Sequence, residues 1–386
     1  MSIRDYIHLP AIAAGFISVL VGFTSSAVII FQAAKAAGAT PEQIGSWMIA
    51  LGFGMGITTI GLSLRYKAPV ITAWSTPGAA LLVTSLPGIP MTEAIGAFLF
   101  SAMLITLSGV TGWFERVINR IPLPIAAAML AGILFRFGVD VFISMQTQFL
   151  LVIIMFAVYL LFKRLLPRYA IIAVLLVGLL ICQFQGLLDF EGFEFIFALP
   201  VIITPTFSAS TLIGVAVPLF VVTMVSQNIP GISVLRAAGY QTPISPLITW
   251  TGITTLVLAP FGVFAINLAA ITAAICTGKE AHEDPDKRYL AALSAGFFYL
   301  LLGVSGAAVA GLFAAFPGEF ILSLAGLALL STIANSITTA VSNESTREAA
   351  VITFLVTASG VTLFSIGSAF WGLVAGVIAL LLIRND

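Results

Sequence analysis

The chain has 386 residues, of which 60% are hydrophobic and only 8% are charged. Soluble domains carry roughly 25% charged residues, so this composition excludes an ordinary soluble protein and predicts an all-α, multi-pass (polytopic) membrane protein. Acidic and basic residues balance at 16 each, which excludes a basic surface for nucleic acid.

Apolar stretches long enough to cross a bilayer recur along the whole chain. The simple spans are predicted at 11–33, 43–63, 92–112, 121–138, 143–163, 169–187, 211–230, 244–258, 288–310, 318–338, 347–360 and 364–383. Two further apolar stretches, 70–85 and 262–277, are interrupted or too short to cross as simple helices. Counting both as broken spans predicts about 14 transmembrane segments.

The distribution of lysine and arginine supports this count. With the N-terminus in the cytoplasm, 14 of the 16 basic residues fall on the cytoplasmic side, and only Lys35 and Arg136 fall outside. This agrees with the rule that cytoplasmic loops are enriched in basic residues. If either short stretch is not counted as a membrane crossing, the basic residues no longer gather on one side of the membrane. Both termini are therefore expected in the cytoplasm.

Short sequence blocks recur about 195 residues apart. KAAG at 35–38 returns as RAAG at 236–239, and GITTI at 56–60 returns as GITTL at 252–256. Further blocks follow in the same order, which indicates a duplication. Each half then has seven spans, an odd number, so the halves enter the membrane in opposite orientations. A 7+7 inverted repeat with interrupted helices is typical of secondary transporters.

The first broken stretch, 70–85, contains the run Ser-Thr-Pro-Gly at 75–78, which is typical of a helix start. Thr76 is held extended by the following proline and is predicted to cap a helix that begins at that proline. The repeat places this stretch on 262–277, where Asn267 follows a β-favouring run and is predicted to cap a second half-helix. Each broken span is therefore predicted to be a short strand followed by a half-helix.

Extended backbone at membrane depth needs partners from protein or from a wet cavity. Two such segments related by inversion can pair with each other, and the half-helix N-termini then point at one spot from opposite sides. Each N-terminus carries roughly half a positive charge and several N–H groups, so this spot is predicted to bind an anion. A proline kink followed by a packing loop is the alternative interpretation.

Three motifs strongly resemble the bacterial benzoate/proton symporters of the BenE family, and the resemblance covers nearly the whole chain. They are AWSTPGAALL at 73–82, VSQNIPG at 225–231 and FAINLAAITAAI at 264–275. The resemblance implies the fold of uracil permeases and sulfate transporters, in which two inverted repeats form a core domain and a gate domain. It implies core segments at 1–112 and 188–310 and gate segments at 113–187 and 311–386. It also implies import of benzoate or a related aromatic carboxylate with protons across the bacterial inner membrane.

The candidate substrate-binding residues are polar or aromatic and come from the broken stretches and from mid-depth positions of the first and eighth spans. They are Trp74, Ser75, Thr76, Gly78, Phe264, Asn267, Ser25, Gln227 and Asn228. The rings of Trp74 and Phe264 are expected to wall an aromatic substrate. Gln227 best matches the position at which nucleobase members of the fold carry an acidic residue. Hydrogen bonding between helices is the alternative role for the amides.

No aspartate or glutamate lies at the centre of a predicted span, and Glu93, Asp140 and Glu319 lie near span ends. The coupled proton is therefore expected to travel with the substrate carboxylate or on an end-of-span acid. With two histidines in all, no metal site, cofactor or enzyme activity is expected. Transport of another small anion or a nucleobase, or an anion channel, remain the alternatives.

The motif WGLVAG at 371–376 presents small residues four positions apart. Such a face allows close helix packing in a membrane. It is expected to pack either within the gate domain or between two protomers, so a homodimer is one predicted assembly. Lipid is the other expected neighbour of the chain.

Overall fold

The structure is a computed structural model, and the residues that it describes are 8–119, 121–188, 199–314, 316–361, 363 and 368–383. The first half of the chain forms α1 (Leu9–Ala36), α2 (Pro41–Tyr66), β1 (Thr72–Trp74), α3 (Thr76–Ser85), α4 (Met91–Val110), α5 (Trp113–Ile118), α6 (Leu123–Ile143), α7 (Phe149–Leu165) and α8 (Ala170–Phe184). The second half forms α9 (Ala209–Thr211), α10 (Val217–Thr223), α11 (Ile229–Ala237), α12 (Ile244–Leu258), β2 (Ile266–Leu268), α13 (Ile271–Thr277), α14 (Tyr289–Ala314), α15 (Gly318–Val341), α16 (Arg347–Ala358) and α17 (Ser368–Ile383).

The predicted helical membrane protein is confirmed. Among the described residues, 6 helices are long and apolar enough to cross a membrane, and shorter apolar helices accompany them. Large apolar side chains cover the outer helix surfaces, where Phe184 is 87% exposed and Leu382 is 79% exposed. Apolar surface on this scale requires lipid rather than water as its surroundings.

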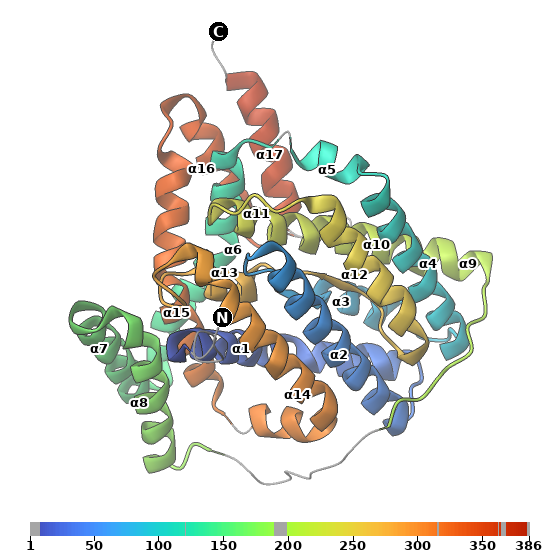
Figure 1. The fold of residues 1–386 in the computed structure, drawn as a ribbon, viewed down its shortest axis with the longest axis horizontal. Helices are drawn as coiled ribbons and strands as arrows, with labels where there is room; N and C mark the ends of the chain where they lie inside the picture. The colour runs from blue at the N-terminus through green and yellow to red at the C-terminus, as the bar shows by residue number, and fades with distance from the viewer. Residues whose placement is uncertain are drawn as a thin grey trace.

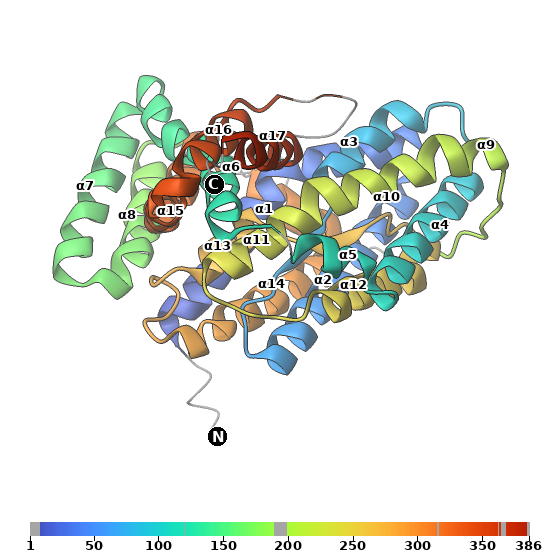
Figure 2. The same cartoon turned by 90° about the horizontal axis from the view of Figure 1, so that it is seen from above.

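The helices gather into two groups (Figures 1 and 2). The larger group contains α1–α5, α9–α14 and both strands, with α2 packed on α14 and α4 packed on α12. The smaller group contains α6–α8 and α15–α17, with α6 packed on α15 and α16. The groups meet where α11 contacts α6 and where α1 and α13 contact α15. In Figure 2 the smaller group occupies the left of the molecule and the larger group the right.

The helix from 209 to 237 runs further than the predicted span 211–230 and contains two wider π turns, η4 (Leu212–Ala216) and η5 (Met224–Asn228). A proline follows each turn closely, Pro218 after the first and Pro230 after the second. Proline has no N–H to donate, and its ring clashes with the carbonyl four residues earlier. A wider turn accommodates this without ending the helix. The helix therefore continues through Pro230 by way of a widened turn just before it.

The two predicted extended segments pair with each other. Strands β1 and β2 form a two-stranded antiparallel sheet in which Ala73 lies opposite Asn267 at the centre. The Ala269 amide extends the ladder by donating to the Ile71 carbonyl at 2.9 Å. Each segment supplies the backbone partners that the other lacks, which is how non-helical backbone survives inside a membrane protein.

The repeated GITT motif supports both strands in the same way. The second threonine of the first copy, Thr59, accepts a hydrogen bond from the Thr72 amide at 3.0 Å. The second threonine of the other copy, Thr255, accepts one from the Ile266 amide, also at 3.0 Å. Both hydroxyls are buried, so each removes the cost of leaving a strand amide without a partner. This contact explains why the motif occurs in both halves.

The predicted helix caps were wrong by one to three positions. Ser75, rather than Thr76, is the N-cap of α3, and its hydroxyl accepts a hydrogen bond from the Gly78 amide at 3.1 Å. Helix α13 begins only at Ile271 and has Ala270 as its N-cap, with no side-chain capping bond. Asn267 is instead the central residue of β2, because pairing with β1 requires it to be extended.

Candidate functional site

A cavity of about 400 Å³ lies between the two helix groups, where both half-helices begin. Its walls come from α1, the β1–α3 segment, α6, the π turn η5, the β2–α13 segment and α17. The lining residues are Gly22, Ser26, Ala73, Trp74, Thr76, Pro77, Ile133, Phe137, Ser226, Gln227, Pro230, Ala269, Ala270, Ile271, Thr272 and Ser368. The cavity falls within the size range of small-molecule sites, which is roughly 300–1,000 Å³.

Trp74 forms an aromatic wall of this cavity and is held in one orientation. Its indole Nε1 donates to the Ser26 hydroxyl at 2.8 Å, and that hydroxyl donates in turn to the Gly22 carbonyl at 2.9 Å. Phe23 packs against the indole with a centroid separation of 5.6 Å. A ring fixed at both its polar and its apolar edge can face a flat substrate at little entropic cost.

The α3 half-helix offers fewer backbone donors than predicted. Pro77 has no N–H, the Gly78 amide donates to the Ser75 hydroxyl, and the Ala79 amide donates to the Ser75 carbonyl at 2.8 Å. The Thr76 amide remains without a hydrogen bond among the described residues. Ser75 and Gly78 therefore shape the helix start, whereas Thr76 lines the cavity.

The α13 half-helix faces the same cavity with Ile271 and Thr272. The amides of Ile271, Thr272 and Ala273 make no hydrogen bonds within the described part of the chain, as expected for a first helical turn without a side-chain cap. The Thr272 hydroxyl is buried and has no partner there either. This end of the cavity therefore presents donors that suit an anion.

The π turn η5 brings Ser226 and Gln227 to the cavity but turns Asn228 away from it. The Gln227 Oε1 accepts a hydrogen bond from the side-chain Nδ2 of Asn267 at 3.4 Å. Its Nε2 makes no hydrogen bond among the described residues and can serve a ligand. Asn228 is fully buried, and its Oδ1 accepts from the Leu268 amide at 2.9 Å, so it supports strand β2.

Phe264 and Asn267 do not line the cavity as the structure describes it. Phe264 is fully buried and packs against Trp47 at 6.2 Å and Phe98 at 6.1 Å between ring centroids. Asn267 is fully buried in β2 and reaches the cavity only through its bond to Gln227. Ser25 belongs to α1, but its side chain lies outside the described residues. Direct substrate contact by these residues stays a prediction.

Sequence reasoning did not select Ser26, Ile133, Phe137, Thr272 or Ser368, all of which line the cavity. Ile133 and Phe137 are ordinary apolar residues of α6, so nothing in their local sequence marks them. Thr272 carried a signal, since it follows the predicted start of the second half-helix. Gly22 also lines the cavity, and a Cβ at this position would lie 2.8 Å from the Thr272 side chain.

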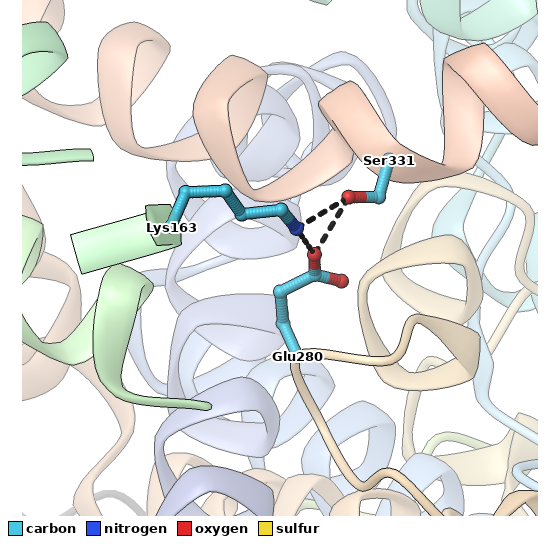
Figure 3. Close-up of polar contacts among 3 residues, drawn as sticks. All are labelled: Lys163, Glu280 and Ser331. Carbon is cyan, nitrogen blue, oxygen red and sulfur yellow. Dashed lines mark hydrogen bonds and ion pairs between the residues drawn. The ribbon is translucent and has the colours of Figure 1, made fainter. Parts of the chain in front are cut away.

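An ion pair joins the two helix groups beside α13 (Figure 3). Lys163 of α7 binds Glu280, which lies in the loop after α13 and outside the spanning segments. Ser331 of α15 accepts from the Lys163 ammonium at 2.9 Å and donates to the Glu280 carboxylate at 2.6 Å. Any movement of one group past the other at this point must break the pair.

We expect Glu280→Gln to be less stable than the wild type at neutral pH. Burial raises the pKa of the Glu280 carboxyl, but the hydrogen bonds from Lys163 and Ser331 and the Lys163 charge outweigh burial and lower it below 4.5. A lowered folded-state pKa gives stability that is present above the ordinary glutamate pKa and is lost as pH falls through the folded-state value. Thermal unfolding of both proteins across this range should show the difference shrinking toward acid pH. If the two proteins differ in stability by the same amount at every pH, the ion pair with Lys163 does not contribute to stability.

The small-residue face of α17 packs inside the smaller helix group. A Cβ on Gly372 would lie 2.0 Å from the Thr357 hydroxyl, and one on Gly376 would lie 1.8 Å from the Thr353 hydroxyl, both on α16. The WGLVAG motif is therefore occupied by α16, which supports the alternative of packing within one protomer. Assembly into a homodimer stays a prediction and would need another surface.

A multi-pass helical protein with a small-molecule cavity between two helix groups has the architecture of a membrane transporter. The family model for the benzoate membrane transport protein, BenE, matches residues 5–382. The chain therefore belongs to the BenE family, whose members are membrane transporters and not enzymes.

Individual relatives match over nearly their full length. The chain is 55% identical over 367 residues to the inner membrane protein YdcO of Escherichia coli (strain K12), which covers 95% of this chain and 94% of that protein. It is 42% identical over 371 residues to the benzoate membrane transport protein of Acinetobacter baylyi, which covers 96% of this chain and 94% of that protein.

Two solved structures align with this chain at low sequence identity. The structure of SLC26A9 aligns with a TM-score of 0.52 and 14% identity over 99% of this chain, which spans 66% of that longer chain. The transmembrane domain of the cyanobacterial bicarbonate transporter BicA aligns with a TM-score of 0.48, 12% identity and 98% coverage of both chains. At this identity the likeness to SLC26A9 concerns the fold alone.

Proposed function

We propose that this protein is a secondary active transporter that imports benzoate or a related aromatic carboxylate, together with protons, across the bacterial inner membrane. The observation that carries the proposal is the cavity between the two helix groups. It combines a fixed indole and apolar walls with hydrogen-bond donors at one end. The family and the benzoate transporter of Acinetobacter baylyi support the choice of substrate.

An aromatic carboxylate needs two different surfaces, and the cavity offers both. The ring would lie among Trp74, Ile133 and Phe137, which are apolar or aromatic lining residues. The carboxylate would face the Gln227 Nε2 and the first turn of α13, where donors have no protein partner. No lysine or arginine lines the cavity in the described part of the chain. Amide donors and helix dipoles would therefore balance the negative charge.

We infer that about 14 spans form a 7+7 inverted repeat. The support comes from the strand pair, which is antiparallel and centred on Ala73 and Asn267. Further support comes from Thr59 and Thr255, which hold the first strand and the second strand in the same way. Two equivalent segments that pair in an antiparallel arrangement are expected of halves that enter the membrane in opposite orientations.

We propose a core domain (1–112 and 188–310) and a gate domain (113–187 and 311–386), and the division of the helices into two groups supports this proposal. Helix α5 falls in the proposed gate segment but packs on α4 and α12 of the larger group. The cavity lies between the two groups, so relative movement of the groups would open it to either side in turn. Basic loops on the side of Lys163 and Lys279 would face the cytoplasm, as would both termini.

The decisive experiment is uptake of radiolabelled benzoate into proteoliposomes, with and without an inward proton gradient. We expect accumulation above the external concentration that depends on the gradient. If benzoate enters but its internal concentration never exceeds the passive equilibrium value, the protein is an anion channel. Accumulation of a nucleobase or another small anion in place of benzoate would identify the alternative substrate.

The same assay locates the coupled proton. No carboxylate lines the cavity among the described residues, so the proton would travel with the substrate carboxylate or on an end-of-span acid such as Glu319. Glu319→Gln should keep gradient-driven accumulation in the first case and lose it in the second.

A further inference from the structure

A second cavity of about 310 Å³ lies between the same two helix groups. It differs from the first in chemistry, because its lining is rich in polar and basic residues and includes no aromatic side chain among the residues that the structure describes. Lys279 and Arg288 come from the segment after α13, and Asn335, Thr338 and Thr339 come from α15.

The two cavities follow one another along the boundary between the groups. On α13 the first cavity is lined by Ile271 and Thr272, and the second by Thr277 at the other end of the helix. On α6 the first cavity is lined by Ile133 and the second by Leu130, one turn earlier. At a rise of 1.5 Å per residue, the spacing along α13 corresponds to roughly 8 Å. The second cavity therefore lies further along α13, toward its C-terminal end.

Two basic residues line the second cavity, and neither forms an ion pair with a carboxylate among the described residues. Arg288 is 7% exposed and donates to the carbonyls of Thr277 at 2.9 Å, His282 at 2.9 Å and Glu283 at 3.5 Å. These acceptors are neutral, so the guanidinium charge persists. Lys279 forms no ion pair among the described residues. The nearby Glu280 carboxylate is bound by Lys163 and does not line this cavity.

We propose that the second cavity is a transit site for the substrate carboxylate on the side of the basic loops. This inference rests on the proposed function. Lys279 supplies the attractive charge. The side-chain amide of Asn335, which makes no hydrogen bond among the described residues, supplies a donor. Since no ring lines this site, it holds the carboxylate without selecting the aromatic group. Weak, charge-based binding at this point favours release after selection in the first cavity.

The transport test uses Lys279→Gln, which removes the charge from an exposed side chain and should leave the fold intact. We expect the maximal uptake rate to fall about threefold or more while equilibrium binding of benzoate to the purified protein is unchanged. Lys35→Gln, in the last turn of α1, is the matched control and should transport normally. An unchanged maximal rate in Lys279→Gln, or an equal loss in Lys35→Gln, would overturn the proposal.

A second test does not depend on transport. Both native cysteines are buried, so Thr338→Cys adds one accessible thiol at the second cavity, and Ser359→Cys adds an exposed reference thiol at the end of α16. Rates of modification by anionic and cationic thiosulfonate reagents are compared in the purified protein. After normalisation to the reference, we expect the anionic reagent to be favoured about threefold or more at the cavity thiol. Adding Lys279→Gln should remove this preference.

The two tests separate the possible failures. No preference for the anionic reagent at the thiol from Thr338→Cys would overturn the anion site whatever the substrate is. A clear preference in a protein that does not take up benzoate would overturn the proposed substrate and retain the anion site.

Discussion

Gln227→Ala is expected to weaken the apparent affinity for benzoate about 10- to 100-fold while the protein remains folded. Gln227 lines the cavity from the widened turn η5, and its Nε2 has no hydrogen-bond partner among the described residues. A hydrogen bond to a charged group contributes roughly 1.5–3 kcal/mol, and each 1.4 kcal/mol is a factor of about ten. The measurement is the KM of benzoate uptake in proteoliposomes, with binding to the purified protein measured in parallel.

Two further variants make this result specific. Gln183→Ala removes the same side chain from an exposed position on α8 and should leave KM unchanged. Gln227→Glu keeps the size of the side chain but places a negative charge beside the substrate carboxylate, so it should weaken binding more than alanine does. An unaltered KM in Gln227→Ala would remove this residue from the proposed site.

Gly262→Ala is expected to destabilise the protein by roughly 3 kcal/mol or more, so that little folded protein is recovered. Gly262 has φ +102°, a conformation that alanine adopts only with strain. A Cβ at this position would lie 1.6 Å from the Trp47 Cδ1, and Trp47 is fully buried. The indole cannot move aside without disturbing Phe98 and Phe264, which pack against it. The measurement is thermal unfolding of the solubilised protein together with its yield.

Gly61→Ala is the matched control for this effect. Gly61 lies within α2, and a Cβ there would meet nothing within 4 Å. Alanine favours a helix interior over glycine by roughly 0.5–1 kcal/mol, so this variant should be as stable as the wild type or slightly more so. Equal losses in the two variants would show that glycine replacement as such, and not the turn before β2, is responsible.

The location of the two breaks could be predicted because polar and turn-forming residues are conspicuous inside apolar runs. The run at 75–78 and the amide at Asn267 both interrupt stretches that otherwise suit a membrane helix. The strands that result are confirmed at 72–74 and 266–268. The register between them could not be predicted, since short strands without a polar face carry little pairing information.

The two helix N-caps show why single residue positions are harder to predict than whole segments. Ser75 and Thr76 both carry hydroxyls that can cap a helix, so local preference does not choose between them. In the structure, the Thr223 hydroxyl donates to the Ser75 Oγ at 3.2 Å, a contact from a distant part of the chain. Asn267 has the chemistry of a cap, but pairing with Ala73 keeps it in a strand. Tertiary contacts override local preference at both sites.

The amino-acid sequence by itself determined the membrane class, the approximate helices, the two broken segments and the family. These follow from local quantities, namely apolar length, residue composition and recurring motifs. Only the tertiary structure decided that Gln227 and Trp74 share a cavity with Ile133 and Phe137, whereas Asn228 and Phe264 are buried in support of it. The physical reason is that a cavity is formed by side chains from several helices, and their facing depends on packing, which no single stretch of sequence specifies.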